Sequence, residues 1–310
     1  MSAYLGIDTS NYTTSAALFV DGTVIQRKQL LPVKEGELGL RQSDAVFHHV
    51  RQLPDIIESL YADAAPSPCA VAASDRPQQE EGSYMPCFLV GTGLARQVAA
   101  VSHIPCHLFT HQQGHVMAAL YGADCLSWRR APFLAFHVSG GTTDALLVQP
   151  DVDCVIRCRR VGRSLDLKAG QLIDRVGGML GLPFPAGPAL ERLALTSTAA
   201  FRIKTSVVGC DCHLSGVENQ CRRMIDGGEL PADVALFCLE SVKAAVSAMT
   251  EALLAQYGKL PLVYAGGVMS NGILKAALTE RFDGRFAPPV YSADNAAGIA
   301  VLCAVKEGAL

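Results

Sequence analysis

The chain has 310 residues; half of them are hydrophobic, 18% are charged, and the formal net charge is −3. This composition is typical of a globular protein and excludes a largely disordered chain. Proteins that bind nucleic acid by themselves usually have a basic excess, so the charge argues against autonomous, non-specific nucleic-acid binding. The length favours two domains over one.

The N-terminus and the cysteines indicate the compartment. Residues 1–8 contain no basic segment and reach an acid at Asp8, so they predict a first strand and not a signal peptide. Apolar stretches such as 296–305 are too short for a membrane span, which needs roughly 20 residues. Eleven cysteines without a signal peptide are most simply reduced thiols. We therefore expect a cytoplasmic protein with no membrane segment.

Two segments are similar at a constant offset of 129 residues. Residues 6–18 and 135–147 each contain an apolar run, a turn of small polar residues and a second apolar run. Each continues through a further turn into a strand-like stretch, which is the pattern of an antiparallel meander. The repeat predicts duplicated α/β domains. We place lobe I at 1–130 and lobe II at 131–290, with the last helix, 291–310, packing on lobe I.

The small residues of the repeated turns suit anion binding. The first turn contains Ser10, Asn11 and Thr13, and the second contains Ser139, Gly140 and Gly141. Small residues let backbone N–H groups and hydroxyls approach a phosphate without steric clash. Either turn alone could be a simple hairpin, but their recurrence favours two phosphate-binding turns that face each other across a cleft.

A third glycine-rich turn, Gly266-Gly267, follows an apolar run at 262–265 and precedes an expected helix near Asn271. Such a turn brings backbone and a helix N-terminus close to a ligand. The P-loop lysine motif and the dinucleotide glycine pattern are absent from the sequence, so a nucleotide site would be of another type.

Two histidines four residues apart indicate a metal site. Thr110 and Gln113 match a capping box, which predicts that a helix begins here with His111 and His115 on one face. Two imidazoles at this spacing can bind one metal ion. Gln112 occupies the position where the metalloprotease motif needs glutamate, so peptidase chemistry is disfavoured. The alternative is a pair of surface or capping histidines.

Asp294 could supply a third metal ligand, although an aspartate before a helix is often only an N-cap. Asp174 and Glu191, each taken alone, are interpreted as structural acids, and His48-His49 as a solvated pair. The pattern also predicts a short strand near 88–90 and helices near 47–60, 166–180, 232–257 and 295–305.

Together these motifs resemble the TsaD/YgjD family, historically called Gcp, O-sialoglycoprotein endopeptidase or glycoprotease. The matching segments span nearly the whole chain: 6–10, 111–115, 138–141, 166–174, 185–188, 265–271 and 294–296. The resemblance implies an α/β fold that is duplicated and two-lobed, of the actin/hexokinase-like (ASKHA, ribonuclease H-like) class, with an interlobe cleft. It further implies transfer of a threonylcarbamoyl group from an adenylate to N6 of a tRNA adenosine.

The resemblance also implies site residues, cofactors and partners. The expected ligands of one divalent metal ion, iron or zinc, are His111, His115 and Asp294. The expected contacts of an adenine nucleotide or acyl-adenylate are His137, Val138, Ser139, Gly140, Gly141, Asp174, Gly187, Glu191, Gly266, Gly267 and Asn271. The expected partners are tRNA, reached through partner proteins, and either a TsaB-like protein in a hetero-complex or a second copy in a homodimer.

The first turn departs from the family pattern. The family usually has Ser-Cys-Asp-Glu-Thr where this chain has Ser10-Asn11-Tyr12-Thr13-Thr14, so an acidic pair implicated in transfer is missing. Thr142 also replaces a histidine that is an auxiliary metal contact in the family. Two hypotheses follow. The first is a TsaD-like transferase that moves a threonylcarbamoyl group, or a related carbamoyl or acyl group, from an adenylate to N6 of a tRNA adenosine or to another acceptor; its catalytic residues are not identified. The second is a divergent paralogue that binds nucleotide and metal without catalysis and has a regulatory or scaffold role.

Overall fold

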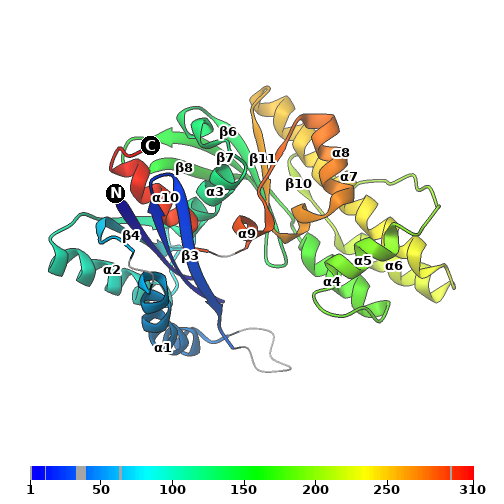
Figure 1. The fold of residues 1–310 in the computed structure, drawn as a ribbon. Coiled ribbons are helices and arrows are strands. Elements are labelled where there is room, and N and C mark those ends of the chain that lie inside the picture. The colour runs from blue at the N-terminus through cyan, green and yellow to red at the C-terminus, as the bar shows by residue number, and fades with distance from the viewer. Residues whose placement is uncertain (1, 11, 33–39, 63–64, 294) are drawn as a thin grey trace. The chain divides into compact units, whose positions relative to one another are not determined.

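The computed structural model describes residues 2–10, 12–32, 40–62, 65–293 and 295–310. The chain divides into two compact units. Unit 1 comprises Met1–Arg130, Gln149–Cys158 and Val290–Leu310, and unit 2 comprises Ala131–Val148 and Arg159–Pro289. Within the described residues the strands form two five-stranded sheets and one two-stranded sheet (Figure 1).

The sheet of unit 1 has the strand order β3-β2-β1-β4-β5. Its strands are β1 (Ala3–Ser10), β2 (Thr13–Val20), β3 (Thr23–Leu30), β4 (Pro68–Arg76) and β5 (Cys106–Thr110). The first three form an antiparallel meander, and β4 and β5 extend it in parallel beside β1. Every residue of β1 is buried, because helices cover both faces of the sheet.

On one face, α1 (Gln42–Tyr61) and α2 (Phe88–Ser102) contribute side chains to a core shared with alternate residues of β1. The strand predicted near 88–90 is wrong, since these residues form the first turn of α2. Its buried residues Phe88, Gly91, Ala95 and Ala99 recur at helical spacing, which a short apolar run does not reveal.

On the other face, α10 (Ala297–Lys306) packs against β1 and against α3 (His111–Gly122). A Cβ on Gly6 would overlap the backbone of Ala300, and one on Gly298 would overlap the carbonyl oxygen of Gly114. The two glycines therefore let α10 approach the sheet and α3 at backbone distance. A short 3₁₀ helix, η1 (Leu126–Arg130), ends the first segment of unit 1.

The second sheet repeats the first, with the order β12-β11-β6-β7-β8. Its strands are β6 (Phe133–Val138), β7 (Thr143–Asp151), β8 (Val155–Arg163), β11 (Leu262–Ala265) and β12 (Arg285–Phe286). The pair β6–β7 is antiparallel like β1–β2, and β11 and β12 are parallel to β6 as β4 and β5 are to β1. The duplication expected from the sequence repeat is thus present in strand order and direction.

Helices form the rest of unit 2. The longer ones are α4 (Ala169–Met179), α5 (Gly187–Ala194), α6 (Ser215–Asp226), α7 (Pro231–Tyr257) and α8 (Gly272–Phe282). The short elements are β9 (Val207–Val208), β10 (Asp211–Cys212), η2 (Gly267–Ser270) and, at the boundary with unit 1, α9 (Pro289–Ser292). The predicted helix at 232–257 is confirmed as α7, whose buried side chains form a large part of the core of unit 2. None of the described helices is long and apolar enough to cross a membrane.

Candidate functional site

The histidine pair in unit 1 lies at the start of α3. The predicted capping box is confirmed: Gln113 N–H donates to Thr110 Oγ1 over 3.2 Å, and Thr110 N–H donates to Gln113 Oε1 over 2.7 Å. These bonds fix the first turn of the helix. His111 and His115 therefore share one face, and their Nε2 atoms lie 2.8 Å apart.

His111 is joined to β1 by Asp8, a residue for which the sequence suggested no role. Nδ1 of His111 lies 2.6 Å from Oδ2 of Asp8, and the Ser74 hydroxyl donates to Oδ1 over 2.8 Å. Asp8 is only 1% exposed. A carboxylate oxygen accepts a hydrogen bond here, so whenever His111 is neutral, as metal binding requires, its proton lies on Nδ1. The lone pair of Nε2 is then directed toward His115.

This arrangement suits a metal ion. The two Nε2 atoms are close neighbours, and a carboxylate on the far nitrogen is the usual outer partner of a metal-binding histidine. The third expected ligand, Asp294, lies outside the described residues. Within the described part of the chain, no group of three or more His, Cys, Asp or Glu side chains could hold a metal ion. The pair alone therefore provides two nitrogen ligands.

The first small-residue turn joins β1 and β2, where Ser10 pairs with Thr13. Both side chains are buried, and the Ser10 hydroxyl has no hydrogen-bond partner among the described residues. Asn11, the other residue expected in this turn, lies outside the described residues.

The interpretation of His49 as solvated is wrong, because its side chain is fully buried beneath this turn. Its Nδ1 lies 2.8 Å from Thr14 Oγ1, and the Thr14 hydroxyl donates to Gln52 Oε1 over 2.7 Å. Since that hydroxyl proton goes to Gln52, Nδ1 of His49 donates to Thr14. Burial lowers the pKa of His49 to about 4, so the ring is neutral at physiological pH.

Unit 2 contains a cavity of 350 Å³. Six of the residues expected to contact a nucleotide line it: Gly140, Asp174, Gly187, Glu191, Gly267 and Asn271. The other lining residues were not among the expected contacts, although they lie in the matching segments 166–174, 185–188 and 265–271: Gly170, Ile173, Pro185, Pro188, Val268 and Ser270.

The second small-residue turn is fixed against the start of α4. The N–H of Gly170 donates to the carbonyl of Ser139 over 3.2 Å, and the N–H of Ala169 donates to Thr143 Oγ1 over 2.9 Å. A Cβ on Gly170 would lie 2.6 Å from the backbone nitrogen of Gly140, whereas Gly140 itself faces open space. Gly170 therefore serves packing, and Gly140 leaves room in the cavity.

Three polar side chains of the cavity each accept a hydrogen bond from a backbone N–H group. Asp174 Oδ1 accepts from the N–H of Ala186 over 2.8 Å. Glu191 Oε1 accepts from the N–H of Gly272 over 2.6 Å. Asn271 Oδ1 accepts from the N–H of Leu274 over 3.2 Å and caps α8. These bonds hold the walls together, and each carboxylate has a second oxygen that can accept a ligand hydroxyl.

The remaining expected nucleotide contacts do not line this cavity: His137, Val138, Ser139, Gly141 and Gly266. Val138 is 1% exposed and belongs to the core of unit 2. Gly266 has φ +100°, and a Cβ there would overlap the backbone of Val138. Its conformational freedom lets η2 start directly beside the end of β6.

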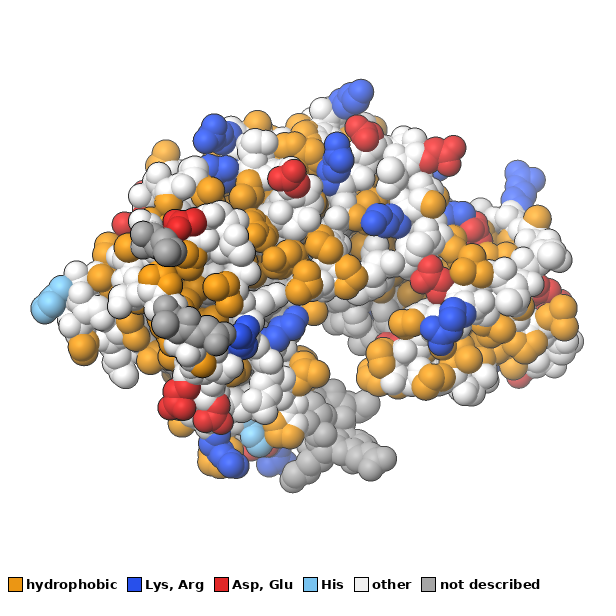
Figure 2. Space-filling view, viewed as in Figure 1, with side chains coloured by type: hydrophobic (Ala, Val, Ile, Leu, Met, Phe, Trp, Pro, Cys, Tyr) orange, Lys and Arg blue, Asp and Glu red, His pale blue; other side chains and the backbone are white. Residues whose placement is uncertain are grey.

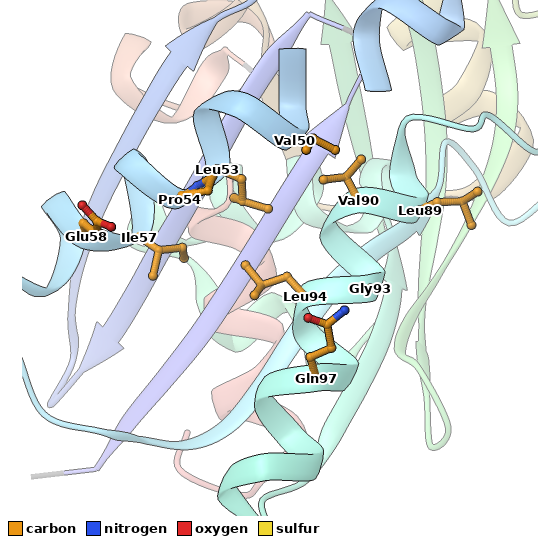
Figure 3. A pocket seen from close by; sticks show the side chains of 10 residues that line it. All are labelled: Val50, Leu53, Pro54, Ile57, Glu58, Leu89, Val90, Gly93, Leu94 and Gln97. Carbon is orange, nitrogen blue, oxygen red and sulfur yellow. The ribbon is translucent and has the colours of Figure 1, made fainter. Parts of the chain in front are cut away.

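An apolar groove of 490 Å³ lies between α1 and α2 in unit 1 (Figure 3). The residues that line it come from both helices: Val50, Leu53, Pro54, Ile57 and Glu58 from α1, and Leu89, Val90, Gly93, Leu94 and Gln97 from α2. Val50 is 55% exposed and Leu89 58% exposed. Exposed apolar surface of this kind is typical of interaction sites.

Comparison with known proteins identifies the family. The family model described as "TsaD: tRNA N6-adenosine threonylcarbamoyltransferase" matches residues 33–301. The chain belongs to this family. A tRNA N6-adenosine threonylcarbamoyltransferase of Granulibacter bethesdensis is 31% identical over 96% of this chain and 86% of its own length. The predicted family and the prediction of a transferase are thus confirmed, and the non-catalytic alternative is not favoured.

Solved structures agree on the fold. Component A of (R)-2-hydroxyglutaryl-CoA dehydratase from Acidaminococcus fermentans matches with a TM-score of 0.57 and 16% identity, covering 99% of this chain and 100% of that one. A ROK hexokinase from Thermus thermophilus matches with a TM-score of 0.53 and 15% identity, again covering 99% and 100%. At this identity the likeness concerns the fold alone, and it confirms the actin/hexokinase-like α/β class.

Proposed function

We propose that this chain transfers a threonylcarbamoyl group from an adenylate to N6 of a tRNA adenosine. The main support is the cavity of unit 2, where glycines of two expected ligand-binding turns meet the acids Asp174 and Glu191. The family match and the names of the relatives support the same reaction. A cavity of 350 Å³ falls in the range of small-molecule and cofactor sites.

The residues of the cavity suit an adenine nucleotide. Gly140 and Gly267 have open space where a side chain would stand, so a ligand can approach the backbone there. The N–H groups of Ala169 and Gly170 at the start of α4 hold the strand and turn beside them, and the small residues of the Ser139–Gly141 turn would let its backbone approach an anionic group such as the adenylate phosphate. The free oxygens of Asp174 and Glu191 would accept ribose hydroxyls, which donate hydrogen bonds.

The histidine pair of unit 1 would hold one divalent metal ion, iron or zinc, with Asp294 as the proposed third ligand. When bound, this ion supplies Lewis-acid chemistry, polarising the carbamate carbonyl or holding anionic groups of the substrate. The chain's own contribution is to keep the two Nε2 atoms close together, through the capping box of α3 and the contact between His111 and Asp8.

The proposed acceptor, tRNA, requires help from a partner. The net charge is −3, and on the face drawn in Figure 2 positive and negative side chains are interspersed. Binding of a polyanion by such a surface would be weak. We therefore propose that tRNA is presented in a complex with a TsaB-like protein, or on a homodimer, in the cytoplasm.

Reconstitution tests the reaction. Purified protein would be mixed with threonine, bicarbonate, ATP, the adenylate-forming enzyme, a TsaB-like partner and unmodified tRNA, and nucleosides would be analysed by mass spectrometry. We expect threonylcarbamoyl-adenosine from the wild type and at least tenfold less from Asp174→Asn. Asp226→Asn, at the exposed end of α6, is the matched control and should act like wild type. Absence of modified adenosine despite tight adenylate binding would overturn the tRNA-transfer proposal.

Metal analysis tests the ligand assignment separately. Wild-type protein purified without chelators should contain close to one iron or zinc per chain. The double variant His111→Ala with His115→Ala should lose that metal while nucleotide binding in unit 2 persists. Metal content equal to wild type in the double variant would refute the assignment of these histidines.

A further inference from the structure

We propose that Asp8 is a positioning residue for the metal site: its buried carboxylate fixes the tautomer and the ring orientation of His111. This inference rests on the proposed metal site, to which it adds a residue outside the expected ligand set. Asp8 is the acid of β1, a strand that is otherwise apolar or hydroxylic and buried throughout. An acid at 1% exposure needs compensating hydrogen bonds.

The carboxylate is held from two sides. Ser74, itself fully buried on the neighbouring strand β4, donates to Oδ1 over 2.8 Å. His111 Nδ1 lies 2.6 Å from Oδ2. β1 and β4 are parallel neighbours, with Ile7 opposite Ala73, so Asp8 and Ser74 are adjacent across the sheet. Rotation of the carboxylate would break both contacts at once, and its orientation is therefore fixed.

A fixed acceptor on Nδ1 selects one tautomer of His111. A neutral imidazole has a single N–H, and only the nitrogen without hydrogen can bind a metal ion. With the proton on Nδ1, the lone pair is on Nε2, the atom that lies 2.8 Å from Nε2 of His115. The negative charge of Asp8 also makes Nε2 a stronger donor to a cation.

A purely structural role for Asp8 would have a different result. In that case Asp8→Asn would lower the stability of the chain but leave the metal affinity of the folded fraction unchanged. If Asp8 positions His111, the folded variant itself binds metal more weakly. Asn has nearly the same size as Asp and can still accept one hydrogen bond, so it removes the charge with little change in packing.

The test uses full-length apoprotein and Zn²⁺, with a competing chelator to measure the dissociation constant and circular dichroism to verify folding. We expect Zn²⁺ affinity to fall about 10- to 100-fold in Asp8→Asn, the range for loss of an outer-shell partner. Ser74→Ala should weaken it less, by about threefold, through a looser Asp8. Asp144→Asn removes a buried acid of unit 2 that pairs with Arg160, and it should leave Zn²⁺ affinity unchanged.

A spectroscopic readout separates positioning from stability. In ¹⁵N NMR of the apoprotein, wild-type His111 should show the Nδ1–H tautomer, and Asp8→Asn should show a mixture of tautomers. A folded Asp8→Asn protein with Zn²⁺ affinity within twofold of wild type would overturn the inference. Should that variant not fold, an unchanged affinity and tautomer in Ser74→Ala would overturn it. Wild-type protein that binds no Zn²⁺ would instead remove the proposed metal site, and the inference with it.

Discussion

The contact between Gly170 and the Ser139–Gly141 turn allows a sharp test of the nucleotide cavity. Replacing Gly170 by Ala would place a Cβ 2.6 Å from the backbone nitrogen of Gly140 and 2.7 Å from the carbonyl carbon of Ser139. Both neighbours are backbone atoms, which cannot rotate away as a side chain could. The turn must therefore shift, and the Gly170–Ser139 hydrogen bond must stretch or break.

The expected cost follows from two opposing terms. Overpacking in a tight contact destabilises a protein by about 1–3 kcal/mol. The better helix propensity of Ala over Gly returns up to about 1 kcal/mol. We expect a net loss of about 1–2 kcal/mol in the free energy of unfolding, with a nucleotide affinity at least tenfold weaker. The matched control is Gly178→Ala in the same helix, where an added Cβ meets nothing within 4 Å. That variant should gain about 0.5–1 kcal/mol.

Urea denaturation, with hydrogen exchange monitored at α4, measures the difference in the free energy of unfolding between the two variants. Calorimetric titration with a non-hydrolysable adenylate analogue measures the nucleotide affinity. If Gly170→Ala were as stable as Gly178→Ala and bound the analogue equally well, the close approach of α4 to the turn would be refuted.

Three further predictions concern single side chains. The pKa of His49 is lowered to about 4 by burial, below its ordinary value of 6.5, so between these values the unfolded chain binds a proton that the folded chain does not. The free energy of unfolding should therefore fall as pH drops from 6.5 to 4, by up to about 3 kcal/mol. Urea titrations of His49→Gln should lack this part of the pH dependence. A variant whose stability depends on pH as the wild type's does would contradict the burial of His49. Gly140→Val should lower analogue affinity at least tenfold with little change in thermal stability, because its side chain would enter the cavity; unchanged binding in calorimetry would exclude Gly140 from the site. Asn271→Ala should lower the free energy of unfolding by about 1 kcal/mol, because α8 loses its cap. Asn271→Ser should retain most of that stability in urea denaturation. Equal losses in the two variants would show that Asn271 does not act as a cap.

Local pattern sufficed for much of the fold. The repeat at an offset of 129 residues predicted both meanders, because alternating apolar runs and small-residue turns are properties of short segments. The capping box at Thr110 and the helix at 232–257 were predicted for the same reason. Motif order along the chain also identified the family, and it named six residues that the structure places around one cavity.

Tertiary structure decided what depends on distant contacts. The run at 88–90 begins a helix and not a strand because Gly91 packs against Ile7 and Thr9 of β1 and Phe88 is buried with Leu31 and Ala45, information that the run itself does not contain. His49 is buried beneath a turn formed by residues far from it in sequence. Asp8 meets His111 across 103 positions of the chain. No local pattern encodes such a meeting, since it exists only once β1 and α3 pack in the same unit.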